Sequence, residues 1–199
     1  STISGNSTGV DGGGVFVQNG THAVINSTIS GNSAAGSGGG VEILDAATVV
    51  VRSNTITGNR ADSDGDATGV GGGISLTTGM GGTPTATLHN TIVAGNLVGA
   101  SGSNGPDDVS STTATALNGG SLNNLIGNAA TAGGLTHGVN GNIVGDAGTG
   151  TIPIEAALLA AGIAPGLANA DRRPRAYAFE RWPTFRRDLW REIVASARD

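Results

Sequence analysis

The chain repeats a short segment of itself. The seven residues STISGNS at 1–7 return unchanged at 27–33, and a third version, NTITGNR, stands at 54–60. Self-similarity at a period of roughly 20–50 residues is typical of proteins built from stacked structural units. This period of 26 residues is the strongest constraint on the fold, because each unit must fit against the next.

A Gly-Asn pair recurs with the repeat. Successive pairs are separated by 26, 27, 37 and 32 residues, and a weaker Gly-Asp pair follows 18 residues later. The pairs are Gly5-Asn6, Gly31-Asn32, Gly58-Asn59, Gly95-Asn96, Gly127-Asn128 and Gly145-Asp146. Glycine permits a tight bend, while stacked asparagine amides can hydrogen-bond to one another. We therefore predict an asparagine ladder at a turn.

A triple glycine followed by an alternating segment recurs as GGGVFV (12–17), GGGVEI (38–43) and GGGISL (71–76). Apolar residues occupy every second position, which is the pattern of a strand with one buried face. We expect one face to carry Val15, Val41 and Ile74 together with Val17, Ile43 and Leu76. The opposite face would carry Phe16, Glu42 and Ser75.

A second alternating set precedes each Gly-Asn pair. We align Ala23 and Ile25 with Val49 and Val51 and with Ala86 and Leu88, followed by Ile29, Ile56 and Ile92. The segment from Val51 to Ile56 is one residue longer than its counterparts, which predicts a β-bulge. A threonine column is expected at Thr2, Thr28, Thr55 and Thr91.

These patterns predict an all-β fold. Short strands that repeat in register, with no helical pattern between them, can stack as coils of a parallel β-helix, or solenoid. Small aliphatic residues fill such a narrow interior, which accounts for a chain with 36 glycines and 3% aromatic residues. The chain has no cysteine, so disulfides and thiolate metal sites are excluded.

Composition divides the chain into three segments. Residues 1–146 hold the repeats, and residues 147–170 form a Gly/Ala-rich connection. Residues 171–199 lack glycine and carry eight arginines against five acids, whereas residues 1–170 carry two arginines against ten acids. We expect the C-terminal segment to be a helical tail, with Phe185, Leu189 and Ile193 on one face after Thr184. Three interpretations of the tail stay open: a cap on the solenoid, a surface that binds anions, or a segment foreign to the repeats.

The segments STISGNS…GGGVEI, NTIVAGN (90–96) and GPDDVSS…LNNLIGN (105–128) resemble the repeats of bacterial surface β-helices. The likeness is to polymorphic outer-membrane-protein-like and choice-of-anchor Q proteins. It implies a right-handed parallel β-helix of about five to six coils in a larger protein. It also implies a secreted or cell-surface location, associated with the outer membrane, and a structural or adhesive role with glycans or other proteins as partners. We expect the chain to be a fragment, with no transmembrane segment, no nucleic-acid partner and no catalysis.

The alternative is a carbohydrate-active β-helix enzyme. A pectate lyase-like site needs several carboxylates beside a base, and only Glu42 and Asp45 lie near Arg52 in sequence. A polygalacturonase-like site is suggested by Asp107-Asp108 and His137-Gly138, but the chain contains no lysine for the third part of that pattern. We therefore interpret GPDDVSS as a loop of the repeat, and Arg52 and its acidic neighbours as a solvated polar face.

The sharpest polar cluster is ADSDGDATG at 61–69. Asp62, Asp64 and Asp66 alternate with small residues, a spacing that can wrap carboxylate oxygens around a hard cation. The segment lacks the downstream glutamate of a full EF-hand loop. We predict a structural Ca²⁺ site at these three residues and no other cofactor.

Overall fold

The structure is a computed structural model, and it describes residues 1–111 and 117–145. These residues form four sheets of short strands and two short 3₁₀ helices, η1 (Ala129–Thr131) and η2 (Val139–Gly141). The predicted tail and the connection 147–170 lie outside the described residues. No helix within 1–111 and 117–145 is both long and apolar enough to cross a membrane.

The four sheets contain six, five, four and three strands. The six-stranded sheet consists of β1 (Thr2–Ser4), β5 (Thr28–Ser30), β9 (Thr55–Thr57), β13 (Ile92–Ala94), β17 (Leu125–Ile126) and β18 (Ile143–Val144). The five-stranded sheet consists of β15 (Gly105–Pro106), β14 (Leu97–Val98), β10 (Arg60–Ala61), β6 (Ser33–Ala34) and β2 (Ser7–Thr8). The four-stranded sheet consists of β16 (Val109–Ser111), β11 (Ile74–Thr77), β7 (Val41–Leu44) and β3 (Val15–Gln18). The three-stranded sheet consists of β12 (Thr85–His89), β8 (Thr48–Arg52) and β4 (Thr21–Ile25).

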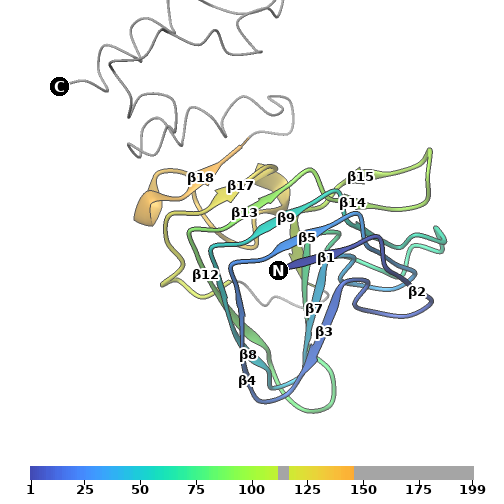
Figure 1. Ribbon diagram of the computed structural model, residues 1–199, viewed down its shortest axis with the longest axis horizontal. Helices are drawn as coiled ribbons and strands as arrows, with labels where there is room; N and C mark the ends of the chain where they lie inside the picture. Colours follow the sequence, from blue (N-terminus) through green and yellow to red (C-terminus); the bar gives the residue numbers. More distant parts are fainter. Residues whose placement is uncertain (112–116, 146–199) are drawn as a thin grey trace, which may run out of the picture. The chain divides into compact units, whose positions relative to one another are not determined.

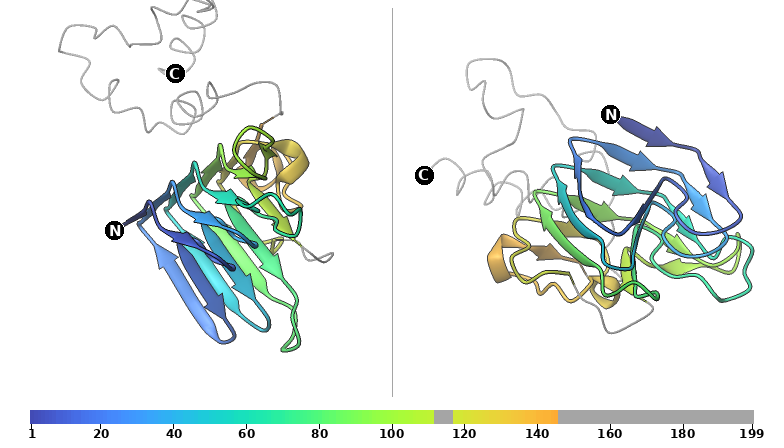
Figure 2. Two further views of the ribbon diagram at one scale, coloured as in Figure 1. Left: turned by 90° about the vertical axis from the view of Figure 1, so that its right-hand side faces the viewer. Right: turned by 90° about the horizontal axis from the view of Figure 1, so that it is seen from below.

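The chain visits the four sheets in turn and then returns to the first. Strands β1, β2, β3 and β4 form one coil, and β5 follows beside β1, so that each strand pairs with its equivalent one coil along. In Figure 1 the four-stranded and three-stranded sheets converge at the turn between β3 and β4, and the six-stranded sheet forms the third side. Figure 2 shows the coils stacked in chain order. The pairing is parallel except between β14 and β15, so the predicted stack of short parallel strands is confirmed as a β-solenoid arrangement.

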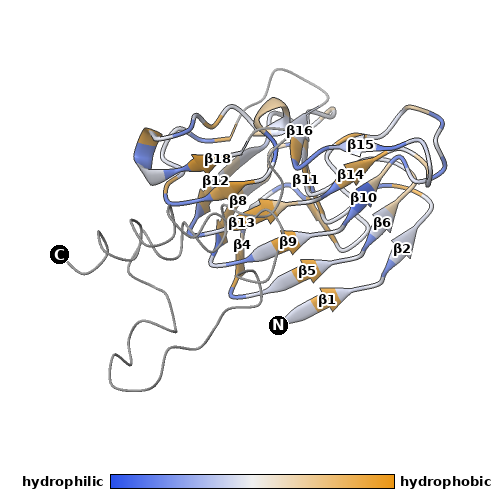
Figure 3. Cartoon of the chain, turned by 90° about the horizontal axis from the view of Figure 1, so that it is seen from above, coloured by the Kyte–Doolittle hydropathy of each residue, from blue (hydrophilic) through white to orange (hydrophobic). Residues whose placement is uncertain are grey.

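Aliphatic side chains fill the interior in columns. Ile3 stacks on Ile29, Ile56 and Val93 in the six-stranded sheet, and the latter three are fully buried. The apolar centres of β1, β5 and β9 stand out between their polar ends in Figure 3. In the four-stranded sheet, Val15 pairs with Val41, which pairs in turn with Ile74, and Val17 pairs with Ile43, which pairs with Leu76, as predicted.

The predicted alignment of the three-stranded sheet is wrong by one residue in its first strand. Val24, and not Ile25, pairs with Val51, while Ile25 faces outward at 39% exposure. Ile56 pairs with Val93 rather than Ile92. With these pairings, the inward residue of the three-stranded sheet precedes the inward residue of the six-stranded sheet by five positions in every coil. The alignment therefore needs no β-bulge.

The predicted asparagine ladder is present at the corner between the six-stranded and five-stranded sheets. The Nδ2 atom of Asn32 donates to Oδ1 of Asn59 at 2.9 Å, and Nδ2 of Asn59 donates to Oδ1 of Asn96 at 3.0 Å. Each Oδ1 also accepts the backbone N–H of the preceding asparagine, and each Nδ2 also donates to an isoleucine carbonyl such as that of Ile29. The amides are therefore satisfied without water although they are buried.

The ladder begins as predicted but ends differently. Its first member is Asn6, which is exposed, and its last is Asp108, whose Oδ1 accepts from both the backbone N–H and Nδ2 of Asn96. Asn128 does not belong to it; its side chain caps η1 by accepting from the backbone N–H of Ala130. We call Asn6, Asn32, Asn59, Asn96 and Asp108 the first ladder.

A second ladder, which the sequence patterns did not reveal, runs along the corner between the three-stranded and six-stranded sheets. Its members are Asn54, Thr91, Asn124 and Asn142, all buried. The backbone N–H of Asn54 donates to Oγ1 of Thr91, that of Thr91 to Oδ1 of Asn124, and that of Asn124 to Oδ1 of Asn142. Thr91 therefore does not extend the threonine column, where Ile92 pairs with Thr55 instead.

Triple glycines let neighbouring coils approach closely. A Cβ on Gly40 would lie 2.5 Å from the carbonyl oxygen of Gly73 and 3.0 Å from Nδ2 of Asn59. The first distance is shorter than real Cβ contacts and the second is unusually tight, so a side chain at this position would push the coils apart. These glycines therefore provide the room that the first ladder needs.

We predict that Asn59→Ala destabilises the solenoid by about 2–6 kcal/mol, because it leaves two buried N–H donors of Asn32 unpaired at about 1–3 kcal/mol each. Asn6→Ala is the matched control from the same ladder and should cost less than about 1 kcal/mol, because Asn6 is exposed and its backbone N–H still donates to Asn32. Chemical denaturation of both variants measures the difference. Equal losses would contradict the structural role of the buried amides.

We predict that Gly40→Ala lowers stability by about 1–3 kcal/mol or more, which is the usual cost of overpacking a filled interior. Gly9→Ala should be nearly neutral, because a Cβ on Gly9 meets no atom within 4 Å. Melting temperatures of the two variants, measured by circular dichroism, test this. A Gly40 variant as stable as the Gly9 variant would refute the close approach of the coils.

Candidate functional site

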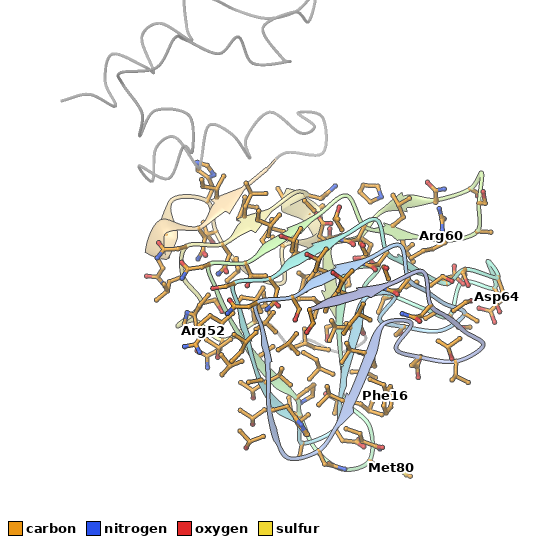
Figure 4. All side chains as sticks on the ribbon, in the orientation of Figure 1. Phe16, Arg52, Arg60, Asp64 and Met80 are labelled. Carbon is orange, nitrogen blue, oxygen red and sulfur yellow. The ribbon has the colours of Figure 1, made fainter. Side chains whose placement is uncertain are left out.

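The acidic loop after β10 brings the three predicted ligands together. Asp62, Asp64 and Asp66 each offer one carboxylate oxygen, and these oxygens all lie within 4.8 Å of one another. Asp64 and Asp66 are exposed, whereas Asp62 is buried. Figure 4 shows Asp64 on a loop at the right-hand edge of the view. The three carboxylates that the sequence singled out therefore lie close together in space.

Hydrogen bonds to neighbouring coils and within the loop fix its shape. The backbone N–H of Asp62 donates to the carbonyl of Gly36 at 3.0 Å, which ties the loop to the preceding coil. Asp62 has a φ of 50°, and its Oδ1 accepts from the backbone N–H of Ala67 at 2.9 Å. The backbone N–H of Gly65 donates to the carbonyl of Asp62. The loop therefore folds back on itself around the Asp62 side chain.

Asp66 is anchored at the exit of the loop. Its Oδ1 accepts from the hydroxyl of Thr68 at 2.7 Å and from the backbone N–H of Thr68 at 3.0 Å. These two bonds, first the hydroxyl and then the N–H, lower the pKa of Asp66. An ionised carboxylate held in this way, next to two others, is the kind of oxygen donor that Ca²⁺ takes from proteins.

Asp107 and Asp108 form the connection between β15 and β16, and both are buried. Oδ2 of Asp107 accepts the backbone N–H of Gly71 at 2.7 Å, and its Oδ1 accepts the hydroxyl of Ser110. Asp108 ends the first ladder, and burial raises its pKa although Asn96 donates to it. Both carboxylates therefore accept structural hydrogen bonds.

The remaining residues of the enzyme-like patterns lie apart. His137 is exposed, and its Nδ1 lies 3.2 Å from both backbone polar atoms of Val144. Arg52 faces outward on β8 of the three-stranded sheet, as expected, whereas Glu42 lies on β7 of the four-stranded sheet. Asp45 accepts from Nε2 of Gln18 and the backbone N–H of Gly81, which lower its pKa in that order. The structure thus does not assemble Arg52, Glu42 and Asp45 into one face.

Glu42 is the residue whose environment sequence reasoning missed. The alternation placed it correctly on the outward side of β7, but the side chain is 0% exposed and therefore does not lie on a solvated face. Outward residues of a strand are usually solvated in a sheet with one buried face. Its burial depends on the turn of Gly38 and on its neighbours in adjacent coils, which the sequence pattern does not reveal.

Comparison with known proteins finds a likeness over a short segment of this chain. No family model matches it, and no solved structure matches it. A stretch of 43 residues, 22% of the chain, is 54% identical to part of the ribosomal RNA large subunit methyltransferase K/L of Cellvibrio japonicus (strain Ueda107). The match spans 5% of that protein's length, so the likeness is confined to a short segment.

Proposed function

We propose that residues 1–146 are a structural or adhesive module of a secreted or cell-surface bacterial protein, folded as a right-handed parallel β-helix of about five to six coils. The observation that carries this proposal is the pair of polar ladders, which tie consecutive coils together along both corners of the six-stranded sheet. A stack held in this way is a rigid rod, which is what a surface scaffold requires.

The use of the buried carboxylates supports a scaffold over an enzyme. An inverting glycosidase needs two carboxyls that flank the scissile bond with room for water between them. Asp107 instead accepts from Gly71 and Ser110, and Asp108 accepts from Asn96. These carboxylates act as hydrogen-bond acceptors that close the coil.

The outer face of the six-stranded sheet supports an adhesive role. Thr2, Thr28 and Thr55 pair in register, two residues from a second column formed by Ser4, Ser30 and Thr57. The face therefore presents hydroxyl groups at the regular strand spacing of about 4.8 Å. Surface glycans and other proteins with repeated polar groups are the partners that we propose for it.

We further propose that Asp62, Asp64 and Asp66 hold Ca²⁺ as a structural ion that stiffens the loop. The three carboxylate oxygens lie close together, and repulsion between like charges at short distance is relieved when a cation binds. Asp64 is exposed and contributes its side chain at the tip, so its removal should leave the fold intact.

For the acidic loop we predict that isothermal titration calorimetry detects Ca²⁺ binding to the wild type and loses the signal in Asp64→Ala. Ser63→Ala, in the same loop, is the control and should keep the signal, because Ser63 carries no carboxylate. A titration without heat in the wild type, or an unchanged signal in Asp64→Ala, would contradict a Ca²⁺ site at these residues.

For the whole module we predict that the purified protein with Ca²⁺ does not cleave polygalacturonate. Absorbance of unsaturated products tests lyase activity, and an assay of reducing ends tests hydrolase activity. Turnover by the wild type that disappears in Asp107→Asn or Asp108→Asn would contradict the structural role. It would favour the alternative function, a pectate lyase-like or polygalacturonase-like enzyme. In the full-length gene, an anchor or autotransporter segment would agree with the surface location.

A further inference from the structure

Glu42 occupies a closed position on the outward side of the four-stranded sheet. It pairs with Phe16 on β3 in the preceding coil and with Ser75 on β11 in the following coil. The turn before β7 lies directly on it, since a Cβ on Gly38 would come within 2.6 Å of the Glu42 Cβ. Phe16 lies on β3, the edge strand of this sheet, and is 47% exposed. Its side chain therefore stands between Glu42 and solvent at that end of the column.

The carboxylate lacks the partners that a buried charge requires. Neither Oε1 nor Oε2 makes a hydrogen bond of acceptable geometry, although the hydroxyls of Ser75 and Thr77 are close. Those two hydroxyls lie 3.2 Å from each other. An isolated ionised carboxylate away from water is costly, and proteins usually avoid the cost by keeping the group neutral.

Within the described residues, the groups around Glu42 offer it no positive charge. Strands β3, β7, β11 and β16 contain no other titratable residue. The acidic residues beside these strands are Asp11, Asp45, Asp107 and Asp108, of which Asp11 acts on Glu42 through its like charge. The two arginines within the described residues are engaged elsewhere: Arg60 donates to the carbonyl of Gly99, and Arg52 faces outward on the three-stranded sheet.

Burial therefore decides the state of Glu42. It raises the pKa from 4.5 to about 7, helped by the charge of Asp11 and opposed by the hydroxyls of Thr77 and Ser75. In the unfolded chain the group would titrate near its ordinary value. Between these two pKa values the folded protein keeps a proton that the unfolded chain releases, so stability falls as the pH rises through this window.

We propose that Glu42 is a proton-operated lock on the outward side of the four-stranded sheet. While the carboxyl is neutral, the side chain stays buried between Phe16 and Ser75 and under the turn of Gly38. When the carboxyl ionises, it must reach water, and the side chain of Phe16 and the turn of Gly38 move to let it out. The module is thereby tightest in mildly acidic surroundings and loosens near neutral pH.

The lock is tested by unfolding the wild type and Glu42→Gln over a range from about pH 4 to about pH 8.5, a window that brackets both pKa values. The glutamine has the same shape and cannot ionise. Relative to this variant, the unfolding constant of the wild type should rise by up to about 300-fold across the window, because it rises about tenfold for each pH step of one between the two pKa values.

Asp45→Asn is the control for a carboxyl that does not titrate in this range. The pKa of Asp45 is lowered from 3.8 by Gln18 and Gly81, so the stability of this variant relative to the wild type should stay nearly constant between about pH 4 and about pH 8.5. The Glu42→Gln variant should instead gain stability relative to the wild type as the pH rises. If the ratio of the unfolding constants of the wild type and Glu42→Gln does not change with pH, the lock is overturned.

A direct titration keeps the proposal testable even if a variant does not fold. Carbon-13 NMR of the wild-type Glu42 carboxyl should give a midpoint near 7, and a midpoint near the ordinary 4.5 overturns the lock. Amide hydrogen exchange should report the opening. Protection at Gly38 and Glu42 should fall above the midpoint, while protection at Ile29 in the six-stranded sheet should not; uniform protection at all pH values also overturns the lock.

Discussion

The asparagine side chain of the first ladder is the interaction on which the rest of the solenoid depends. A corner between two sheets interrupts the strand pairing, so the backbone there needs other partners. Asn59 supplies them in both directions: Nδ2 donates to Ile29 and to Asn96, while Oδ1 accepts from the backbone and side chain of Asn32. One buried amide thus joins three consecutive coils, and the stack needs no large side chains at that corner.

The second ladder does the same work at the opposite corner of the six-stranded sheet. Ladder positions 54 and 59 stand five residues apart, as do 91 and 96, so β9 and β13 of that sheet are held at both ends. The residue before each asparagine or threonine of the two ladders adopts a positive φ, for example Gly58 at 64° and Gly95 at 71° in one corner, and Ser53 at 56° and Asn90 at 50° in the other. The regular surface that we propose for partner binding follows from this double fixation.

Sequence reasoning predicted the features that repeat as identical letters. The Gly-Asn pairs located the first ladder, and the GGG segments fixed the register of β3, β7 and β11. The second ladder was missed because serine, asparagine and threonine occupy equivalent positions there, at Ser27, Asn54 and Thr91. A hydroxyl oxygen and an amide oxygen can each accept a hydrogen bond from the same backbone N–H. The hydrogen bond is therefore kept from coil to coil although the residue type changes. Because Thr91 was aligned with the threonine column, the predicted isoleucine column was also displaced by one residue at Ile92.

Buried side-chain amides bind consecutive coils to one another, and NMR observes those amides directly. We expect the Nδ2 protons of Asn32, Asn59 and Asn96 to exchange slowly with solvent and to show nuclear Overhauser contacts to the asparagine of the neighbouring coil. The exposed Asn104 provides the reference for rapid exchange. Exchange of the three ladder side chains as rapid as that of Asn104, without contacts between coils, would contradict the role of the ladder in holding the solenoid together.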